Sequence, residues 1–396
     1  MDDEEEQYVD WNIIERSMPL HGYRTYVAFT YMGFNIVGFI VNFWVLYVIS
    51  PLLFAPSVKV PKSILFFIFA LCVGDLTTMI AMLLLIIELI FGTWRFSSGI
   101  CTSYLIFDSM NKFIAPIIVF LISRTCYATV CLNKHAGERA ASLKYAMVQL
   151  GVALGFVMLL LSPVFAYSQV FTFYVNPNAT TKEVSVFRKC GFLPPQEIEF
   201  YFNLVMCIVS YAIPLLGIIY WYVSVPFFLK RRALSSLVAS SSAETAMKYV
   251  IRTVFLLTAI YIVCWSPYWI SMFAHKYFPV SQKYIVIISY FIHLLPYVSC
   301  VAYPLIFTLL NRGIRTAHAK IVQDQRRRFK SLTDDATTQV RSVIRNFPNR
   351  SRTHSKQTIG DDRSEVESVT QIHHNYLTVL SDSVSTKTDN ESETLL

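Results

Sequence analysis

Apolar residues run along this chain in long blocks that are separated by short polar stretches. Seven such blocks lie at residues 27–50, 62–91, 98–131, 143–167, 199–229, 248–274 and 284–310. A helix needs about 20 apolar residues to cross the hydrocarbon core of a bilayer, and each block is long enough. Because only helices and closed barrels satisfy their backbone hydrogen bonds within lipid, we predict seven membrane-spanning helices. The expected fold class is an all-α membrane protein, built as a seven-transmembrane helix bundle.

The composition and the distribution of charge fit this architecture. Of the 396 residues, 54% are hydrophobic and only 15% are charged, which is too apolar for a soluble protein. Basic residues border alternate loops, at Lys59, Lys62, Lys134, Arg139, Lys144, Lys230, Arg231, Arg232, Lys248 and Arg252. Because cytoplasmic loops carry the excess of Lys and Arg, we place the N-terminus outside and the C-terminus in the cytoplasm. The net charge of +8 then reflects membrane topology, and we expect no nucleic-acid partner.

The chain divides into four segments by composition. Residues 1–26 are a short acidic extracellular tail, and residues 27–310 hold the seven spans. Residues 311–330 combine spaced apolar residues with many cations, which predicts an amphipathic helix on the lipid of the inner membrane surface. Residues 331–396 are rich in Ser, Thr, Asp and Asn, so we expect a disordered cytoplasmic tail. The acidic N-terminus lacks the apolar run of a signal peptide, so the first span should insert as its own anchor.

The longest outer loop carries the pattern of a short β-hairpin. Its segments QVFTFYV and EVSVFRKC alternate apolar with polar residues on either side of the turn-rich PNATTK. Asn178 begins an N-glycosylation sequon on the side of the membrane where glycans are added. Six of the eight cysteines lie in or at the ends of spans, whereas Cys101 and Cys190 fall outside, where oxidising conditions allow a disulfide.

The third span is unusual because it carries ionisable side chains at membrane depth. Asp108 and Lys112 are four residues apart and therefore share one helix face, with Asn111 between them. Such groups almost always point into the bundle or into a wet cavity, so the outer half of this span is a predicted pocket wall. Asp108 either contacts a ligand, or pairs with Lys112 one turn away, or does both. Asp75 in the second span is also a candidate for function.

Single residues recur in a fixed order on these spans: Asn42, Asp75, Cys101, Pro214, Tyr222, Trp265, Pro267 and Pro304. With them the chain resembles a divergent rhodopsin-like (class A) G-protein-coupled receptor over about residues 27 to 325. The resemblance implies a plasma-membrane receptor, not an enzyme, that signals to a heterotrimeric G protein through movement of the sixth helix about Pro267. It also pairs Cys101 with Cys190 in a disulfide.

The inner ends of the third and seventh spans depart from the family pattern. Thr125-Cys126-Tyr127 stands where the family has Asp-Arg-Tyr, and Arg124 lies two residues too early to replace the missing arginine. Tyr303 replaces the Asn of the family's NPxxY motif. By resemblance, the switch and the surface facing the G protein comprise Cys126, Tyr127, Tyr222, Pro267, Tyr303 and Pro304.

The resemblance implies neither a cofactor nor a metal ion. Tyr297 stands where opsins carry their retinal-linking lysine, and the seventh span has no lysine, which argues against a light receptor. Asp75 and Asn111 are candidates for the family's ion site. Tyr303 opposite them argues against a bound sodium ion.

The resemblance places a ligand in the outer half of the bundle. Asp108 falls where amine receptors and some peptide receptors hold the cationic nitrogen of the ligand, and Tyr297 falls where such receptors bond this carboxylate. The other candidate contacts are Lys112, Trp265, Tyr268, Trp269, His293 and Glu88.

Two ligand classes remain open. A cationic neuropeptide is favoured, because a hairpin lid and an acidic outer tail suit a peptide and attract positive charge. A biogenic amine would use Asp108, Tyr297 and Ser210, but the neighbouring Lys112 would repel a small cation. A transporter or channel is a remote alternative, because the chain shows neither an internal repeat nor a charged relay through all the spans.

The C-terminal tail carries short regulatory patterns. Ser and Thr near acidic residues in SDSVSTKTDNESETLL are candidate phosphorylation sites, which in the resembled family implies arrestin as a partner. Residues 391–396 resemble an acidic dileucine signal for a sorting adaptor, and the final Thr-Leu-Leu resembles a PDZ-binding terminus. No cysteine follows Cys300, so the basic helix has no palmitoyl anchor.

Overall fold

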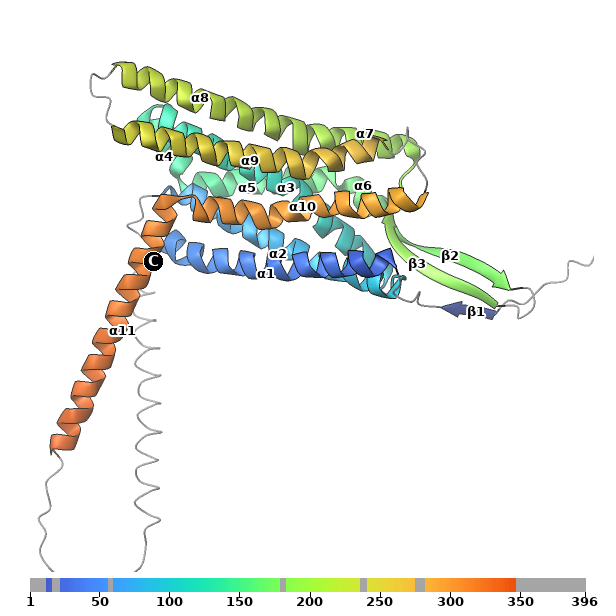
Figure 1. Ribbon diagram of the computed structural model, residues 1–396, viewed down its shortest axis with the longest axis horizontal. Coiled ribbons are helices and arrows are strands. Elements are labelled where there is room, and N and C mark those ends of the chain that lie inside the picture. The colour runs from blue at the N-terminus through green and yellow to red at the C-terminus, as the bar shows by residue number, and fades with distance from the viewer. Residues whose placement is uncertain are drawn as a thin grey trace, which may run out of the picture. The chain divides into compact units, whose positions relative to one another are not determined.

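Helices dominate the part of the chain that the computed structural model describes, namely residues 12–15, 22–55, 60–178, 183–235, 241–274 and 282–346. The longer helices before residue 310 lie side by side in Figure 1 and are α1 (Tyr23–Phe54), α2 (Lys62–Phe91), α3 (Ser98–Cys131), α5 (Leu143–Leu160), α7 (Gln196–Cys207), α8 (Ile213–Ser235), α9 (Ser241–Ala274) and α10 (Gln282–Leu309). Shorter elements are α4 (Lys134–Ala141), α6 (Ser162–Tyr167) and the π-helical turn η1 (Ile208–Ala212).

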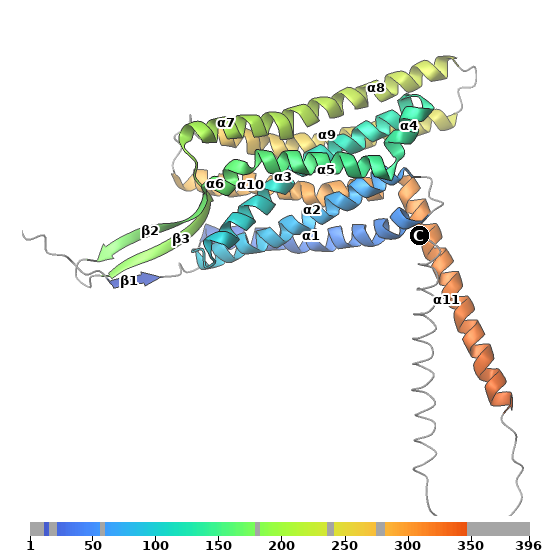
Figure 2. The same cartoon turned by 180° about the vertical axis from the view of Figure 1, so that it is seen from behind.

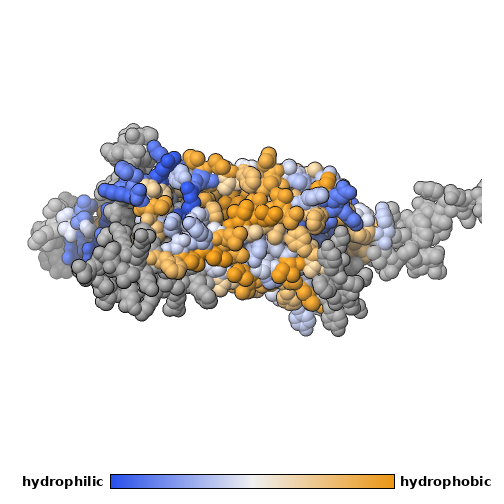
Figure 3. Space-filling view, turned by 90° about the horizontal axis from the view of Figure 1, so that it is seen from above, coloured by the Kyte–Doolittle hydropathy of each residue, from blue (hydrophilic) through white to orange (hydrophobic). Residues whose placement is uncertain are grey.

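Seven segments of the described chain are long and apolar enough to cross a membrane, which confirms the predicted seven-helix bundle. The helices α2 and α3 begin and end at the predicted residues. Figure 3 shows a hydrophobic belt between two more hydrophilic ends. Large apolar side chains of the spans are exposed, for example Ile40 on α1 at 64%. Such exposure is expected where membrane lipid surrounds the protein.

The third span lies at the centre of the bundle and positions the candidate site. In an apolar stretch of 18 residues of the third span 61% of the residues are buried, whereas in the corresponding stretch of the fourth span 17% are buried. It packs against α2, α5 and α8 through a stripe of small and branched residues, namely Ile114, Ala115, Ile118, Val119 and Ile122. These residues recur at helical spacing and are all buried, and Asp108 and Asn111 of the same helix are buried as well, at 7% and 2% exposure.

A three-stranded sheet lies at one end of the bundle (Figure 2). The strands β2 (Ser168–Asn178) and β3 (Glu183–Phe192) form the predicted antiparallel hairpin. Its β3 also pairs in parallel with β1 (Asn12–Glu15), which the sequence did not predict because four residues are too few to show a strand pattern. Residues 12–15 of the acidic tail therefore belong to the sheet. The side chain of Asn178 and residues 179–182 lie outside the described residues.

Cys101 and Cys190 form the expected disulfide, with their Cα atoms 5.5 Å apart. The bond joins the first turn of α3 to β3. It therefore ties the hairpin to the central helix of the bundle.

Two of the predicted spans are interrupted, and a proline explains each interruption. In the fourth span, Leu161 leaves the helical conformation and Pro163 opens α6. In the fifth span, the π-helical turn η1 ends at Ala212, two residues before Pro214. Proline has no backbone N–H to donate to the carbonyl four residues earlier, so the hydrogen-bond ladder must break or shift at these points.

The helix after the seventh span is longer than predicted. One helix, α11 (Arg312–Asn346), covers residues 311–330 almost entirely and continues beyond them. The expectation of disorder is therefore wrong for residues 331–346. Neither Gly nor Pro occurs between Gly313 and Pro348, so nothing in the sequence terminates the helix earlier. Residues 347–396, with the phosphorylation, sorting and PDZ-binding patterns, lie outside the described residues.

Candidate functional site

The centre of the candidate site is a carboxylate with two partners. Lys112 donates from Nζ to Asp108 Oδ2 at 2.6 Å, one helical turn away on α3. Tyr297 on α10 donates its hydroxyl to Asp108 Oδ1 at 2.5 Å. Asp108 is only 7% exposed, so this charge is removed from solvent and both of its oxygens are bonded. The pair with Lys112, one of the alternatives left open by the sequence, is therefore formed in the structure.

Aromatic rings surround the Lys112 ammonium. Its Nζ lies 5.6 Å from the centroid of the Tyr268 ring and 5.4 Å from that of the Tyr297 ring. The Tyr268 ring in turn makes edge contacts with three other candidate residues, Trp265, Trp269 and His293. The structure thus brings seven of the eight predicted ligand-contact residues into one connected group.

Glu88 is the member of the predicted set that lies apart from this group. It is in the last turn of α2, where its backbone carbonyl accepts from the N–H of Gly92, which caps the helix in the left-handed conformation. The described side chains give Glu88 no direct contact with Asp108 or Lys112.

Tyr31 on α1 belongs to the site, although no pattern in the sequence indicates it. Its ring meets the Tyr297 ring edge-on at 6.2 Å, and its hydroxyl donates to the backbone carbonyl of Tyr290 at 2.8 Å. A tyrosine in an apolar helix has no local signature of function. Only the folded bundle shows that the Tyr31 ring packs edge-on against the Tyr297 ring.

A column of aromatic rings leads from the site toward the fifth span. Trp265, which is 1% exposed, stacks near Tyr261, and Tyr261 stacks on Tyr211 in η1 with ring centroids 5.7 Å apart. The Tyr261 hydroxyl donates to the backbone carbonyl of Ser210 at 2.9 Å. This bond uses a carbonyl of the π-helical turn next to Pro214. The column therefore connects the candidate site to the irregular turn of the fifth span.

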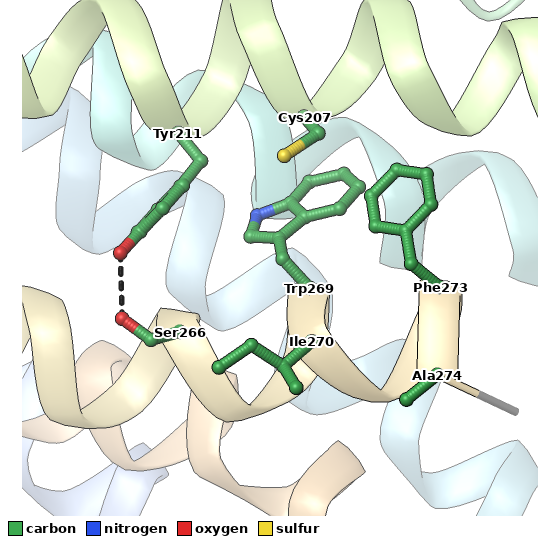
Figure 4. Close-up of a pocket in the computed structure, with 7 residues that line it drawn as sticks. All are labelled: Cys207, Tyr211, Ser266, Trp269, Ile270, Phe273 and Ala274. Carbon is green, nitrogen blue, oxygen red and sulfur yellow. Dashed lines mark hydrogen bonds between the residues drawn. The ribbon is translucent and has the colours of Figure 1, made fainter. Parts of the chain in front are cut away.

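A cavity of about 560 Å³ lies between α7 with η1 and α9. Figure 4 shows its lining residues, which are Cys207, Tyr211, Ser266, Trp269, Ile270, Phe273 and Ala274. Across it, the hydroxyls of Tyr211 and Ser266 are 2.5 Å apart. Among these residues the sequence predicted only Trp269, and Asp108 is not part of the lining.

Asp75 and Asn111 are brought together deeper in the bundle. Asn111 donates from Nδ2 to Asp75 Oδ1 at 2.9 Å and lies 3.6 Å from the Cys300 sulfur. Among the described residues, Asp75 Oδ2 and Asn111 Oδ1 have no hydrogen-bond partner. Tyr303, which is fully buried, likewise has a hydroxyl without a partner within the described part of the chain.

At the other end of α3, Cys126 and Tyr127 are partly buried where the family pattern places Arg and Tyr. Arg124 donates to the Tyr145 hydroxyl at 3.2 Å and lies over that ring, which Arg139 of α4 also contacts. Arg124 is thus held against Tyr145 of α5. The side chain of Tyr222 lies outside the described residues.

Comparison with known proteins adds independent evidence. A family model described as 7 transmembrane receptor (rhodopsin family) matches residues 41–307. The chain is 72% identical over 344 residues, 87% of either chain, to the probable G-protein coupled receptor npr-29 of Caenorhabditis elegans. It is 23% identical over 279 residues to neuropeptide receptor 18 of the same species, covering 65% of this chain and 58% of that protein. It is 25% identical over 284 residues to the human neuropeptides B/W receptor type 1, covering 70% of this chain and 81% of that receptor.

Proposed function

Because this chain belongs to the rhodopsin family of seven-transmembrane receptors, we propose that it is a plasma-membrane receptor for a cationic neuropeptide. It is a receptor and not an enzyme. The observation that carries the proposal is the buried carboxylate of Asp108, which Tyr297 orients in the outer half of the bundle. A carboxylate in such surroundings attracts a guanidinium or ammonium group more strongly than one in water.

Three features favour a peptide over a small amine. The sheet of β1, β2 and β3 offers an outer surface that a small molecule would not need. Two relatives carry the word neuropeptide in their names. The Ser210 hydroxyl, which an amine ligand would use, donates instead to the Met206 carbonyl at 2.6 Å and is buried. A biogenic-amine receptor is therefore the second candidate.

The outer end of the bundle is the end with the sheet. The disulfide between Cys101 and Cys190 supports this orientation, because such bonds form and persist in oxidising compartments. The basic residues Lys134 and Arg139 of α4 follow the opposite end of α3, which suits the cytoplasm. On this orientation Asn178 is available for glycosylation and the C-terminal tail meets the intracellular partners.

Signal transmission would follow the aromatic column. A ligand that contacts Asp108 better in one state shifts the population toward that state. Tyr268 directly follows Pro267 in α9, and Trp265 lies two residues before this proline, where the helix can bend. Movement of α9 about Pro267 would then open the inner surface near Cys126 and Tyr127 to a G protein. Arrestin, a sorting or PDZ adaptor at the C-terminus, and inner-leaflet lipid along α11 are proposed as further partners.

The test is a second-messenger screen in cells that express the chain, with a library of neuropeptides and a library of biogenic amines. We expect a saturable calcium or cyclic AMP response to one or more peptides that contain Arg or Lys. Surface labelling of an epitope tag verifies that the receptor reaches the membrane. A response to an amine, with silence toward every peptide, would contradict the proposal and favour the second candidate.

A further inference from the structure

The Lys112 ammonium sits in a cage of the kind that proteins use to bind ammonium ligands. Asp108 supplies the negative charge at 2.6 Å, and Tyr268 and Tyr297 supply ring faces at 5.6 and 5.4 Å. The three cage residues come from α3, α9 and α10 and are all less than 10% exposed. A carboxylate with converging aromatic faces is the usual chemistry of recognition for primary and quaternary ammonium groups.

We infer that Asp108, Tyr268 and Tyr297 form an ammonium-binding site that the receptor's own Lys112 fills as a tethered cation. The lysine has the reach to do so because it lies one turn after Asp108 on the same helix face. Its side chain is 13% exposed, so this ammonium is largely removed from solvent. The cage therefore holds one positive charge already and is electrically neutral as a unit.

This inference deepens the proposed function, on which its consequence for the ligand rests. A small amine cannot enter the cage beside Lys112, because two ammonium ions would share one carboxylate. An Arg or Lys side chain of a peptide reaches Asp108 only by displacing the Lys112 ammonium, which is attached by a flexible four-carbon chain. Binding is then an exchange of one cation for another. A peptide offsets the loss of the Lys112 pair through its further contacts with the receptor, whereas a small amine has few such contacts, so Lys112 selects against small amines.

The cage also predicts what happens when the tethered cation is removed. Truncation in Lys112→Ala leaves Asp108 without its positive partner and opens a space with the shape of propylammonium. A free propylammonium ion should enter that space and replace the missing part of the lysine. Neither a neutral molecule of similar size nor a receptor without the carboxylate should show this effect.

The experiment is thermal unfolding of the purified, detergent-solubilised receptor with and without millimolar propylammonium. We expect Lys112→Ala to lower Tm by about 5 °C and propylammonium to restore most of the loss. Wild type should not respond, 1-propanol should not rescue, and Lys112→Ala combined with Asp108→Asn should not be rescued. The matched control is Lys134→Ala, which removes the lysine of an exposed pair with the same spacing, Lys134 and Glu138. That variant should show neither the loss nor the rescue.

If Lys112→Ala does not fold, Lys112→Met with ammonium ion replaces it, because Met fills the place of the four-carbon stem and leaves out only the Nζ ammonium. Equal rescue in the variant that also lacks the Asp108 charge, or no rescue in a folded single variant, would overturn the inference. The unfolding experiment uses no peptide, so its outcome does not depend on the proposed function. If propylammonium rescues the variant but no peptide activates the receptor, the ammonium cage is supported and the proposed peptide ligand is contradicted.

Discussion

The pairing of Asp108 with Lys112 predicts a large energetic coupling between the two residues. Their ion pair is 2.6 Å long, and their side chains are only 10% and 13% exposed, respectively. Removing one partner of such a pair leaves a buried charge without compensation, which costs about 3 to 5 kcal/mol of stability. Replacing both partners with neutral residues of similar size is nearly neutral by comparison.

A double-mutant cycle measures this coupling directly. We expect Asp108→Asn and Lys112→Met each to destabilise the receptor by about 3 kcal/mol, the lower end of the range because some exposure remains. The double variant should lose about as much as one single variant or less, which gives a coupling of at least about 3 kcal/mol. The assay is denaturant or thermal unfolding of the purified receptor, with all four proteins in the same detergent.

The chain provides its own reference pair for this cycle. Lys134 and Glu138 on α4 have the same spacing, but their charged atoms are 3.9 Å apart and their side chains are 87% and 63% exposed. An exposed pair of this kind contributes about 0.3 to 0.5 kcal/mol. Additive losses at Asp108 and Lys112, or a coupling no larger than that of the exposed pair, would refute the reasoning from burial.

Three further predictions concern other parts of the molecule. Cys101→Ser removes the disulfide that closes a separation of 89 residues, so stability should fall by about 4 kcal/mol and surface expression, measured by flow cytometry, should drop sharply. A normal surface level of Cys101→Ser would contradict the predicted role of the disulfide. Tyr261→Phe should cost about 1 kcal/mol because its hydroxyl is bonded to the Ser210 carbonyl, whereas Tyr303→Phe should be neutral or stabilising because that buried hydroxyl has no partner among the described residues. The reverse order of the two thermal midpoints would disprove this comparison. Cys126→Arg restores the family's arginine at the inner end of α3 and should raise the agonist-stimulated second-messenger response, whereas an unchanged maximal response would show that coupling does not depend on this position.

The long apolar blocks predicted the bundle well because lipid imposes a strong constraint on sequence. A helix that crosses a bilayer must be apolar along its length, so α2 and α3 could be delimited to the residue. Outside the membrane this constraint is absent. The short strand β1 and the continuation of α11 to Asn346 depend on pairing and on the absence of helix breakers, and composition alone does not show either feature.

The candidate site was predictable where it depends on spacing within one helix. Asp108 and Lys112 lie four residues apart, so their shared face follows from helix geometry. The resemblance added Tyr297. The position of the Tyr268 ring over the Lys112 ammonium and the support of Tyr297 by Tyr31 depend on how three other helices pack, and no local pattern contains that information.

The central claim, a peptide receptor anchored by a carboxylate, is tested most directly by the concentration–response curve of an activating basic peptide on wild type, Asp108→Asn and Glu138→Gln. Glu138 is an exposed carboxylate on α4 and serves as the control. A hydrogen bond to a charged group contributes about 1.5 to 3 kcal/mol, so the half-maximal concentration should rise about 10-fold to 100-fold in Asp108→Asn. It should stay unchanged in Glu138→Gln. Equal curves for all three receptors at matched surface levels would contradict the account.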